Sequence, residues 1–300
     1  KRGIDILVHG ATGRGNDQMR FERYTNQFAP KMTVYAPWRD ALLLKEFPGR
    51  TQMCEYLAKH GIIAFPGGKK RYSTDCNVAG LSHEAEDLES METAMTIVEP
   101  TMGVWPMQAP NKIESVEIEF KEGRPVAING EKLKPFDLLV KANEIGGRNG
   151  VGMSHALENR IIGTKSRGVY EAPGMELLGR SLRYVYHAIL DKRATTMFDR
   201  LSRFIAVQIY DGRYYDLATK AAFAAVDTFA AKATGKVKVG LYKGNIFFQS
   251  LTGVKASLYF EADASMEASK GLNPVSSQGF AEIQSVEARS MAKAGQVTEY

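Results

Sequence analysis

The stretch IDILVHGATGRGNDQMR, residues 4–20, decides the expected fold of this chain. An apolar run with β-branched residues, Ile4–Val8, predicts a strand, and the amphipathic run Gln18–Phe28 predicts a helix. Between them, the glycines within residues 10–15 allow the backbone to turn tightly and to approach a ligand closely. Because free N–H groups and the dipole at a helix N-terminus favour an anion, the stretch predicts an anion-binding loop.

The spacing of this loop differs from two common phosphate-binding motifs. Its pattern is G-x-x-G-x-G rather than the dinucleotide fingerprint, and no Gly-Lys-Ser/Thr follows as in a Walker A loop. The glycines alone fit a plain strand–helix turn equally well. The polar side chains among them favour a zwitterionic ligand, because an arginine can grip a carboxylate and an aspartate can hold an ammonium group. These side chains are Thr12, Asn16, Asp17 and Arg20.

Composition and charge favour a small anionic ligand over nucleic acid. The 300-residue chain has a net charge of +5, with its Lys and Arg dispersed and no dense basic run. No apolar stretch reaches the ~20 residues that span a membrane. The cysteines, Cys54 and Cys76, form no CxxC pair, so we expect no disulfide framework and no metal site, and we predict a cytoplasmic location.

The first part of the chain predicts a parallel sheet. Lys31–Tyr35 reads as a second strand, which with the first strand and helix makes one βαβ unit. The unbroken apolar character of Ile4–Val8 predicts a strand covered on both faces. Leu42–Phe47 and Arg50–His60 read as helices, and Pro66–Gly68 predicts a domain boundary.

A polar segment follows, and it has two interpretations. Residues 72–77 and 82–86 alternate hydroxyls and carboxylates at short spacing. One interpretation is a solvated loop that leads to a helix starting at Ser82; the other is a functional segment. We expect His83 to be a structural hydrogen-bonding residue rather than a metal ligand, because no second ligand lies at a usual spacing.

The remainder alternates between hairpin and helix patterns. Residues 114–130 and 236–248 alternate apolar and polar side chains around glycine-containing turns, which predicts two antiparallel hairpins with one solvated face. A helix over Pro135–Ile145 is expected to stop at the glycine pair that follows it. Four further helices are predicted over Met175–Asp191, Thr195–Tyr210, Tyr214–Lys232 and Ser276–Ala294.

These elements predict an α/β fold in three parts. The parts are a partial doubly wound parallel-sheet nucleotide-binding domain, an α+β synthetase domain, and a C-terminal helix with an apolar stripe that another subunit could cover. The expected bounds are residues 1–68, 69–272 and 273–300.

Four long and unusual strings identify a family resemblance. Together they resemble argininosuccinate synthase, particularly its bacterial form, and they span most of the chain in the expected order. The strings are His9–Arg20, Tyr72–Glu84 (YSTDCNVAGLSHE), Ala142–Asn159 (ANEIGGRNGVGMSHALEN) and Lys165–Gly174 (KSRGVYEAPG).

The resemblance implies an ATP-dependent ligase of arginine biosynthesis. The family joins citrulline to aspartate through a citrullyl-adenylate and releases AMP and pyrophosphate. ATP would be a substrate accompanied by Mg²⁺, no prosthetic group is expected, and the complete enzyme would be a homotetramer. No residue stands out as a nucleophile or a strong base, so catalysis would lie in positioning two substrates and stabilising phosphoryl charge.

The resemblance also implies a set of binding residues. Aspartate would be held by Thr12, Asn16 and Asp17. The nucleotide would lie against Gly10, Thr12, Asp17 and Asp75. Citrulline would contact Asn16, Arg20, Ser73, Ser82, Glu84, Glu158 and Tyr170.

One departure from the family pattern matters. The family opens with a pyrophosphate-binding loop of the form Ser-Gly-Gly-x-Asp-Ser/Thr, and no such string occurs in these residues. A citrulline-contacting tyrosine from the same region is also missing. We therefore expect the chain to be an N-terminally truncated piece that cannot turn over. Two alternatives remain: another ATP-pyrophosphatase-type synthetase, and a non-catalytic fragment that oligomerises through its helices.

Overall fold

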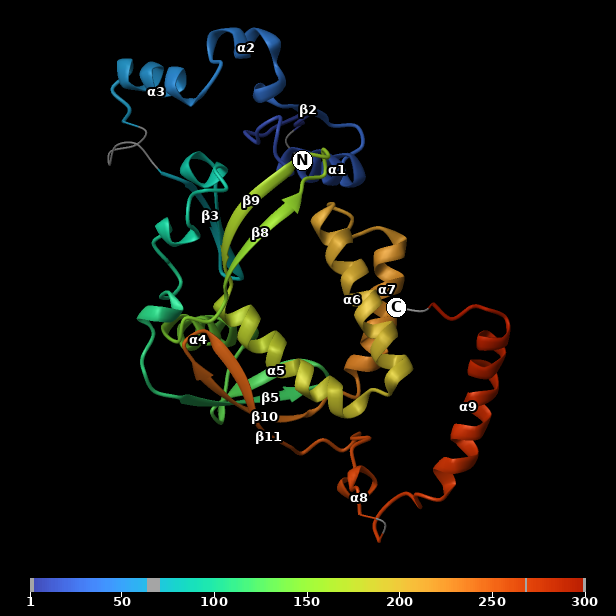
Figure 1. Cartoon of the computed structure of the whole chain (residues 1–300). Helices are drawn as coiled ribbons and strands as arrows, with labels where there is room; N and C mark the ends of the chain where they lie inside the picture. Colours follow the sequence, from blue (N-terminus) through green and yellow to red (C-terminus); the bar gives the residue numbers. More distant parts are fainter. Residues whose placement is uncertain (1–2, 64–70, 268, 299–300) are drawn as a thin grey trace. The chain divides into compact units, whose positions relative to one another are not determined.

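A computed structural model describes residues 3–63, 71–267 and 269–298. The chain forms two compact units, Lys1–Lys255 and Ala256–Tyr300. Within the described ranges, none of the helices combines the length and the apolar character needed to cross a membrane. Figure 1 shows the elements coloured along the sequence.

The first elements form the predicted βαβ unit. Strands β1 (Ile6–Val8) and β2 (Thr33–Tyr35) pair in parallel, and helix α1 (Asp17–Phe28) connects them. The prediction that the first strand is covered on both faces is wrong, because Ile6 is 57% exposed and Val8 is 61% exposed. Among the described residues β1 pairs with β2 alone, and a sheet of two strands buries little of either strand.

Short helices follow this unit. A 3₁₀ turn, η1 (Pro37–Arg39), leads to α2 (Ala41–Glu46) and α3 (Arg50–Lys59), which agree with the two predicted helices. Asp40 caps α2 by accepting hydrogen bonds from the backbone N–H groups of its first turn. The predicted domain boundary at Pro66–Gly68 lies outside the described residues.

The polar segment folds as strands, so the first of its two interpretations, a solvated loop that leads to a helix starting at Ser82, is wrong. Strands β3 (Ser73–Asn77) and β4 (Gly80–Glu84) form a hairpin. Along β4 the residues alternate between half-buried and buried, so that Ser82 and Glu84 share one face while Leu81 and His83 share the buried face. Strands β8 (Met153–Asn159) and β9 (Lys165–Glu171), which the sequence pattern did not predict, complete an antiparallel sheet in the order β3-β4-β9-β8.

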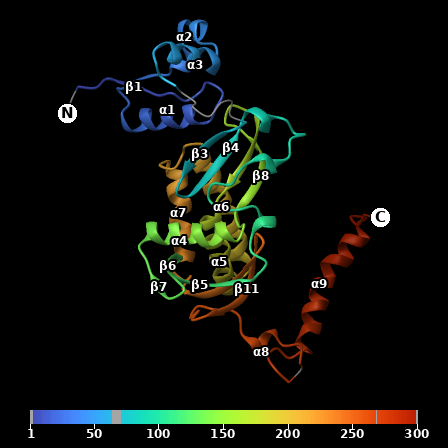
Figure 2. The same ribbon diagram turned by 90° about the vertical axis from the view of Figure 1, so that its left-hand side faces the viewer.

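A second sheet contains both predicted hairpins. Its order is β11-β10-β5-β6-β7, and the central pairing of β10 with β5 is antiparallel. Helices α4 (Pro135–Arg148) and α5 (Pro173–Ile189) pack against it (Figures 1 and 2). The buried residues of β5 and β10 form its core, and they are Val116, Ile118, Phe120, Val237, Val239 and Leu241. The strand bounds are Glu114–Lys121 (β5), Arg124–Ile128 (β6), Glu131–Lys132 (β7), Gly235–Tyr242 (β10) and Asn245–Thr252 (β11).

Three long helices confirm the predicted amphipathic runs. Asp191 caps the second of them through its carboxylate. Short 3₁₀ turns occupy the connection before β5. The helices are α5 (Pro173–Ile189), α6 (Lys192–Tyr210) and α7 (Leu217–Ala230), and the turns are η2 (Glu86–Glu89), η3 (Met95–Ile97) and η4 (Pro106–Gln108).

The second unit contains α8 (Glu261–Ala264) and the predicted last helix, α9 (Ser276–Lys293). The apolar stripe of α9 is exposed within this unit, with Phe280 at 68% and Ile283 at 70% exposure. The bounds of α9 agree with the helix that the sequence predicts over Ser276–Ala294.

Helix α4 (Pro135–Arg148) continues through the glycine pair at which it was expected to stop. A Cβ on Gly147 would lie 2.1 Å from the carbonyl oxygen of Met102, and one on Gly146 would lie 2.7 Å from that of Pro173. The pair therefore permits two backbone segments to approach the helix, and this close packing is the reason for the glycines.

We expect Gly147→Ala to lower the free energy of unfolding by about 2 kcal/mol, because the added methyl group would overlap the backbone at Met102. Gly179→Ala is the matched control. Gly179 lies inside α5 with no atom within 4 Å of an added Cβ, so alanine should stabilise the chain by about 0.5–1 kcal/mol. Urea denaturation measures both variants. Equal stabilities would contradict the packing argument.

Candidate functional site

One face of the four-stranded sheet gathers the side chains expected to bind citrulline. Directly paired residues of neighbouring strands point to the same face. Asp75 pairs with Ser82, and Ser82 pairs with Tyr170. The pairs Ser73–Glu84, Glu84–Gly168 and Glu158–Ser166 extend this set across all four strands. We call this set the polar face, and its expected ligand-binding members are Ser73, Asp75, Ser82, Glu84, Glu158 and Tyr170.

Tyr170 lies at the centre of the polar face in β9. Its hydroxyl donates a hydrogen bond to Glu158 Oε2 at 3.0 Å. Burial raises the pKa of Tyr170 far above its usual value, and the negative charge of Glu158 raises it further. A Cβ on Gly168 would lie 2.8 Å from the Tyr170 ring, so glycine leaves room for the ring. Tyr170 is therefore a fixed, protonated donor on this face.

The opposite face of the sheet is buried and contains a hydrogen-bonded pair of polar side chains. His83 and Glu171 are each 1% exposed, and His83 Nε2 lies 2.8 Å from Glu171 Oε1. The other ring nitrogen of His83 lies 2.9 Å from Thr74 Oγ1. The expectation that His83 is a structural hydrogen-bonding residue is confirmed.

Glu171 also holds the chain segment beneath the sheet. Its carboxylate accepts hydrogen bonds from the backbone N–H groups of Thr101 and Met102 at 2.7–3.0 Å. Because an isolated buried carboxylate is costly, these donors and His83 are what allow it to be there. Glu171 was not identified from the sequence, because its position beside Tyr170 in a strand gives no local signal of this role.

The glycine loop is fixed at its last residue, Asn16. The side-chain Nδ2 of Asn16 donates to the Tyr210 hydroxyl at 2.6 Å, and its Oδ1 accepts from the backbone N–H of Ile161 at 2.8 Å. Tyr210 ends α6, and Ile161 lies in the turn between β8 and β9. Neither residue was identified from the sequence, because each is distant from the loop along the chain.

Arg160 connects the loop to the polar face. Its Nη1 donates to the carbonyl oxygen of Arg14 at 2.9 Å, and its Nη2 donates to Glu84 at 3.2 Å and to Ser166 at 2.9 Å. One guanidinium therefore contacts the loop and two residues of the polar face. The glycine loop and the polar face are thus connected through Arg160.

Arg20 and Asp17 pair with each other at the start of α1. Arg20 Nη1 donates to Asp17 Oδ1 at 2.9 Å, and Arg20 Nε donates to the carbonyl oxygen of Tyr210 at 2.8 Å. The guanidinium carbon lies 4.9 Å from the centre of the Tyr210 ring, within cation–π range. Arg20 Nη2 forms no hydrogen bond within the part of the chain that the structure describes, so it can still donate to a ligand.

The remaining expected residues contribute backbone or an exposed carboxylate. The carbonyl oxygen of Thr12 accepts a hydrogen bond from Gly15 N at 3.3 Å, which closes the glycine loop. Around Gly10 an added Cβ would meet nothing within 4 Å, so the backbone there is open to a ligand. Asp75 is exposed at the centre of β3.

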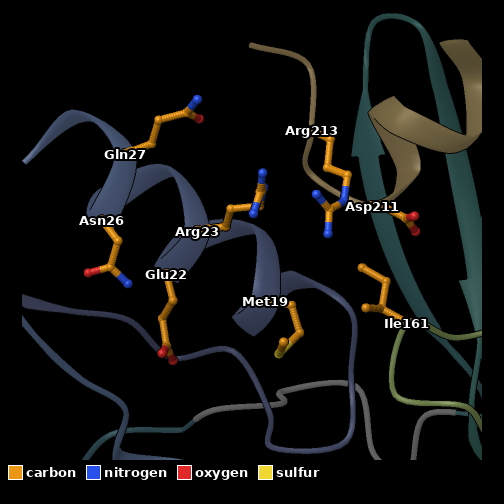
Figure 3. A pocket seen from close by; sticks show the side chains of 8 residues that line it. All are labelled: Met19, Glu22, Arg23, Asn26, Gln27, Ile161, Asp211 and Arg213. Carbon is orange, nitrogen blue, oxygen red and sulfur yellow. The ribbon is translucent and has the colours of Figure 1, made fainter. Parts of the chain in front are cut away.

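A pocket of about 590 Å³ lies between α1 and the segment that contains Asp211 and Arg213 (Figure 3). It contains none of the expected binding residues. Asp216, outside the lining, accepts hydrogen bonds from Arg23 at 2.5 Å and from Arg213 at 3.2 Å, so both arginines of the lining are paired. The residues that line the pocket are Met19, Glu22, Arg23, Asn26, Gln27, Ile161, Asp211 and Arg213.

Two family profiles match the chain. Residues 1–63 match the profile described as arginosuccinate synthase N-terminal HUP domain. Residues 72–291 match the profile described as arginosuccinate synthase C-terminal domain. The expected α/β nucleotide-binding fold followed by a mixed domain is confirmed by these matches.

Curated relatives agree with the profiles. The argininosuccinate synthase of Rhodopirellula baltica is 39% identical over 288 residues, which cover 96% of this chain and 71% of the relative. That of Pseudoalteromonas atlantica is 38% identical, covering 97% of this chain and 70% of the relative. That of Carboxydothermus hydrogenoformans is 39% identical, covering 93% and 69% respectively. The chain therefore belongs to the argininosuccinate synthase family.

Proposed function

We propose that this chain takes part in the ATP-dependent condensation of citrulline with aspartate, which gives argininosuccinate, AMP and pyrophosphate. The observation that carries the proposal is the Arg160 contact to both the glycine loop and Glu84. It supports a single site for two amino-acid substrates, because the loop and the polar face lie within reach of one guanidinium.

The residue types fit citrulline on the polar face. The neutral ureido group of citrulline needs hydrogen-bond partners, and its amino-acid end needs both charges matched. Glu158 and Glu84 would accept from N–H groups and Arg20 would donate, while the Tyr170 hydroxyl, whose proton lies on Glu158, would accept from a ureido N–H group. Ser73, Ser82 and Asn16 complete the proposed citrulline set.

Aspartate and ATP would bind at the loop. Thr12, Asn16 and Asp17 would hold aspartate, and the incoming ammonium group would compete with Arg20 for the Asp17 carboxylate. Gly10, Thr12, Asp17 and Asp75 would lie against the nucleotide. The ureido oxygen would attack the α-phosphorus of ATP, and the aspartate amine would then displace AMP. Catalysis would come from positioning these groups.

The proposal also includes the metal ion, the division into domains, the oligomeric state and the location. Mg²⁺ would enter with ATP as part of the substrate. The three-part division at residues 1–68, 69–272 and 273–300, the homotetramer and the cytoplasmic location remain predictions. The exposed apolar stripe of α9 supports a role in assembly, because such a stripe is stabilised when another surface covers it.

We also propose that the 300 residues alone do not release pyrophosphate. The string Ser-Gly-Gly-x-Asp-Ser/Thr, which would hold the β- and γ-phosphates, does not occur among them. A polypeptide that carries such a loop, supplied in cis or as a separate chain, should restore citrulline-dependent pyrophosphate release.

Calorimetric titration tests the proposed substrate class. We expect the chain to bind citrulline at least about tenfold more tightly than ornithine, which lacks the ureido group and its hydrogen bonds. Pyrophosphate release from ATP with the loop-bearing polypeptide present is the second measurement. Equal binding of the two amino acids, or release that depends on ammonia instead of citrulline, would contradict the proposal.

A further inference from the structure

Tyr210 contacts Asn16 and Arg20, two residues that are expected to bind citrulline. Its hydroxyl accepts from Asn16 Nδ2 and donates to the carbonyl oxygen of Asn159 at 3.1 Å. Its own carbonyl oxygen and its ring both contact Arg20. The hydroxyl, the ring and the carbonyl oxygen of Tyr210 therefore all contact Asn16, the start of α1 or the end of β8.

The hydroxyl of Tyr210 sets the orientation of the Asn16 amide. The Ile161 N–H can donate only to an oxygen, so Oδ1 must face Ile161 and Nδ2 must face Tyr210. This arrangement leaves one N–H and one lone pair of the amide for ligands. Without the hydroxyl, Nδ2 would lose the partner that holds it, and the amide could rotate away from the substrates.

A glycine directly after α6 allows the end of this helix to lie close to Arg20. Gly212 has φ +72°, and a Cβ there would lie 3.2 Å from Arg20 Cγ and 3.3 Å from Arg20 Cα. A side chain would thus press on α1 and strain the backbone. The pKa of Tyr210 is raised, by burial and then by the charge of Glu158, so the hydroxyl keeps its proton and can donate to Asn159.

We propose that Tyr210 is a positioning residue for the amino-acid substrates: its hydroxyl orients the Asn16 amide, and its ring and carbonyl oxygen orient the Arg20 guanidinium. The proposal rests on the proposed function, since citrulline and aspartate are the ligands that Asn16 and Arg20 would touch. Tyr210 acts through these two residues and needs no contact with a substrate of its own.

Tyr210→Phe removes the hydroxyl and keeps the ring and the carbonyl oxygen. We expect the affinities for citrulline and for aspartate to fall about tenfold, because one hydrogen bond that fixes Asn16 is lost. ATP affinity should stay within about twofold, since Tyr210 contacts neither Gly10 nor Asp75, the two residues that are proposed for the nucleotide and for no other substrate. Tyr214→Phe is the matched control, because the Tyr214 hydroxyl has no hydrogen-bond partner among the described residues.

A double-mutant cycle separates positioning from general stability. In an Asn16→Ala background, Tyr210→Phe should change citrulline affinity by less than about twofold, because the hydroxyl no longer has an amide to orient. If the fold losses of citrulline affinity in the two single variants multiply in the double variant, the two residues act independently and the proposal is overturned. So would equal losses of citrulline and ATP binding in the single variant.

Hydrogen–deuterium exchange gives a readout that needs no ligand. We expect Tyr210→Phe to speed amide exchange in residues 10–20 about tenfold, and Tyr214→Phe to leave it unchanged. If the unmodified chain binds no citrulline, the proposed function fails, and the exchange result still decides whether Tyr210 holds the loop. Unchanged exchange in residues 10–20 would overturn the positioning role.

Discussion

Arg20→Ala is expected to weaken binding of citrulline about 100-fold, because hydrogen bonds from a charged group contribute about 1.5–3 kcal/mol. It should also weaken binding of aspartate, because Asp17 loses the partner that orients it. The Arg20 guanidinium is already held by Asp17, by the Tyr210 carbonyl oxygen and by the Tyr210 ring. It therefore reaches a ligand without a large loss of side-chain entropy. ATP affinity should change by less than about threefold, since Arg20 is not among the proposed nucleotide contacts.

Calorimetric titration of each substrate measures this result. Arg180→Ala is the matched control, because Arg180 is exposed on α5 and, among the described residues, forms its ion pair with Glu176 one turn away. Arg20→Lys keeps the charge and loses the planar fork and the stacking on Tyr210, so it should recover little of the affinity. An Arg20→Ala variant with unchanged affinity for both amino acids would remove Arg20 from the site.

Glu171→Ala should lower the free energy of unfolding by about 3–5 kcal/mol, the largest effect on stability that we expect. The substitution leaves the backbone N–H groups of Thr101 and Met102 and the ring of His83 without their acceptor. Buried donors that lose an acceptor cost their full desolvation free energy. Glu171→Gln should also destabilise, because the amide nitrogen cannot accept the hydrogen bonds that the second oxygen accepts now.

Trp105 reports on this region directly. It is buried with Leu88, Val98 and Val169 in the core under the same face of the sheet, so its fluorescence in a Trp38→Phe background follows unfolding there. The control is Glu176→Ala, an exposed member of a surface ion pair, which should cost less than about 0.5 kcal/mol. Equal stability of the Glu171 and Glu176 variants would show that the buried pair contributes nothing.

Local sequence patterns were enough for the elements that bury one regular stripe or face. The alternation along β5 and β10 and the helical period of α5, α6 and α9 predicted these elements nearly to their ends. Such patterns depend only on residues near in sequence, and burial of one face then follows.

The strands of the polar face could not be found in this way. Ser73, Asp75, Ser82 and Glu84 make β3 and β4 look like a loop, since their exposed face carries the polar groups and the apolar residues are few. What makes them strands is that β3 pairs with β4, and β4 pairs in turn with β9, whose residues lie far along the chain. The glycine pair in α4 was misread for the same reason, because its neighbours Met102 and Pro173 are distant in sequence.

The sequence by itself determined the family and the residue types of the site, because long strings such as YSTDCNVAGLSHE carry that information locally. Only the tertiary structure decided how those residues are held. Asn16 and Tyr210 are 194 positions apart, and Glu171 and His83 are 88 positions apart. A hydrogen bond between such residues depends on where two separate elements end in space, and no local period or propensity encodes that distance.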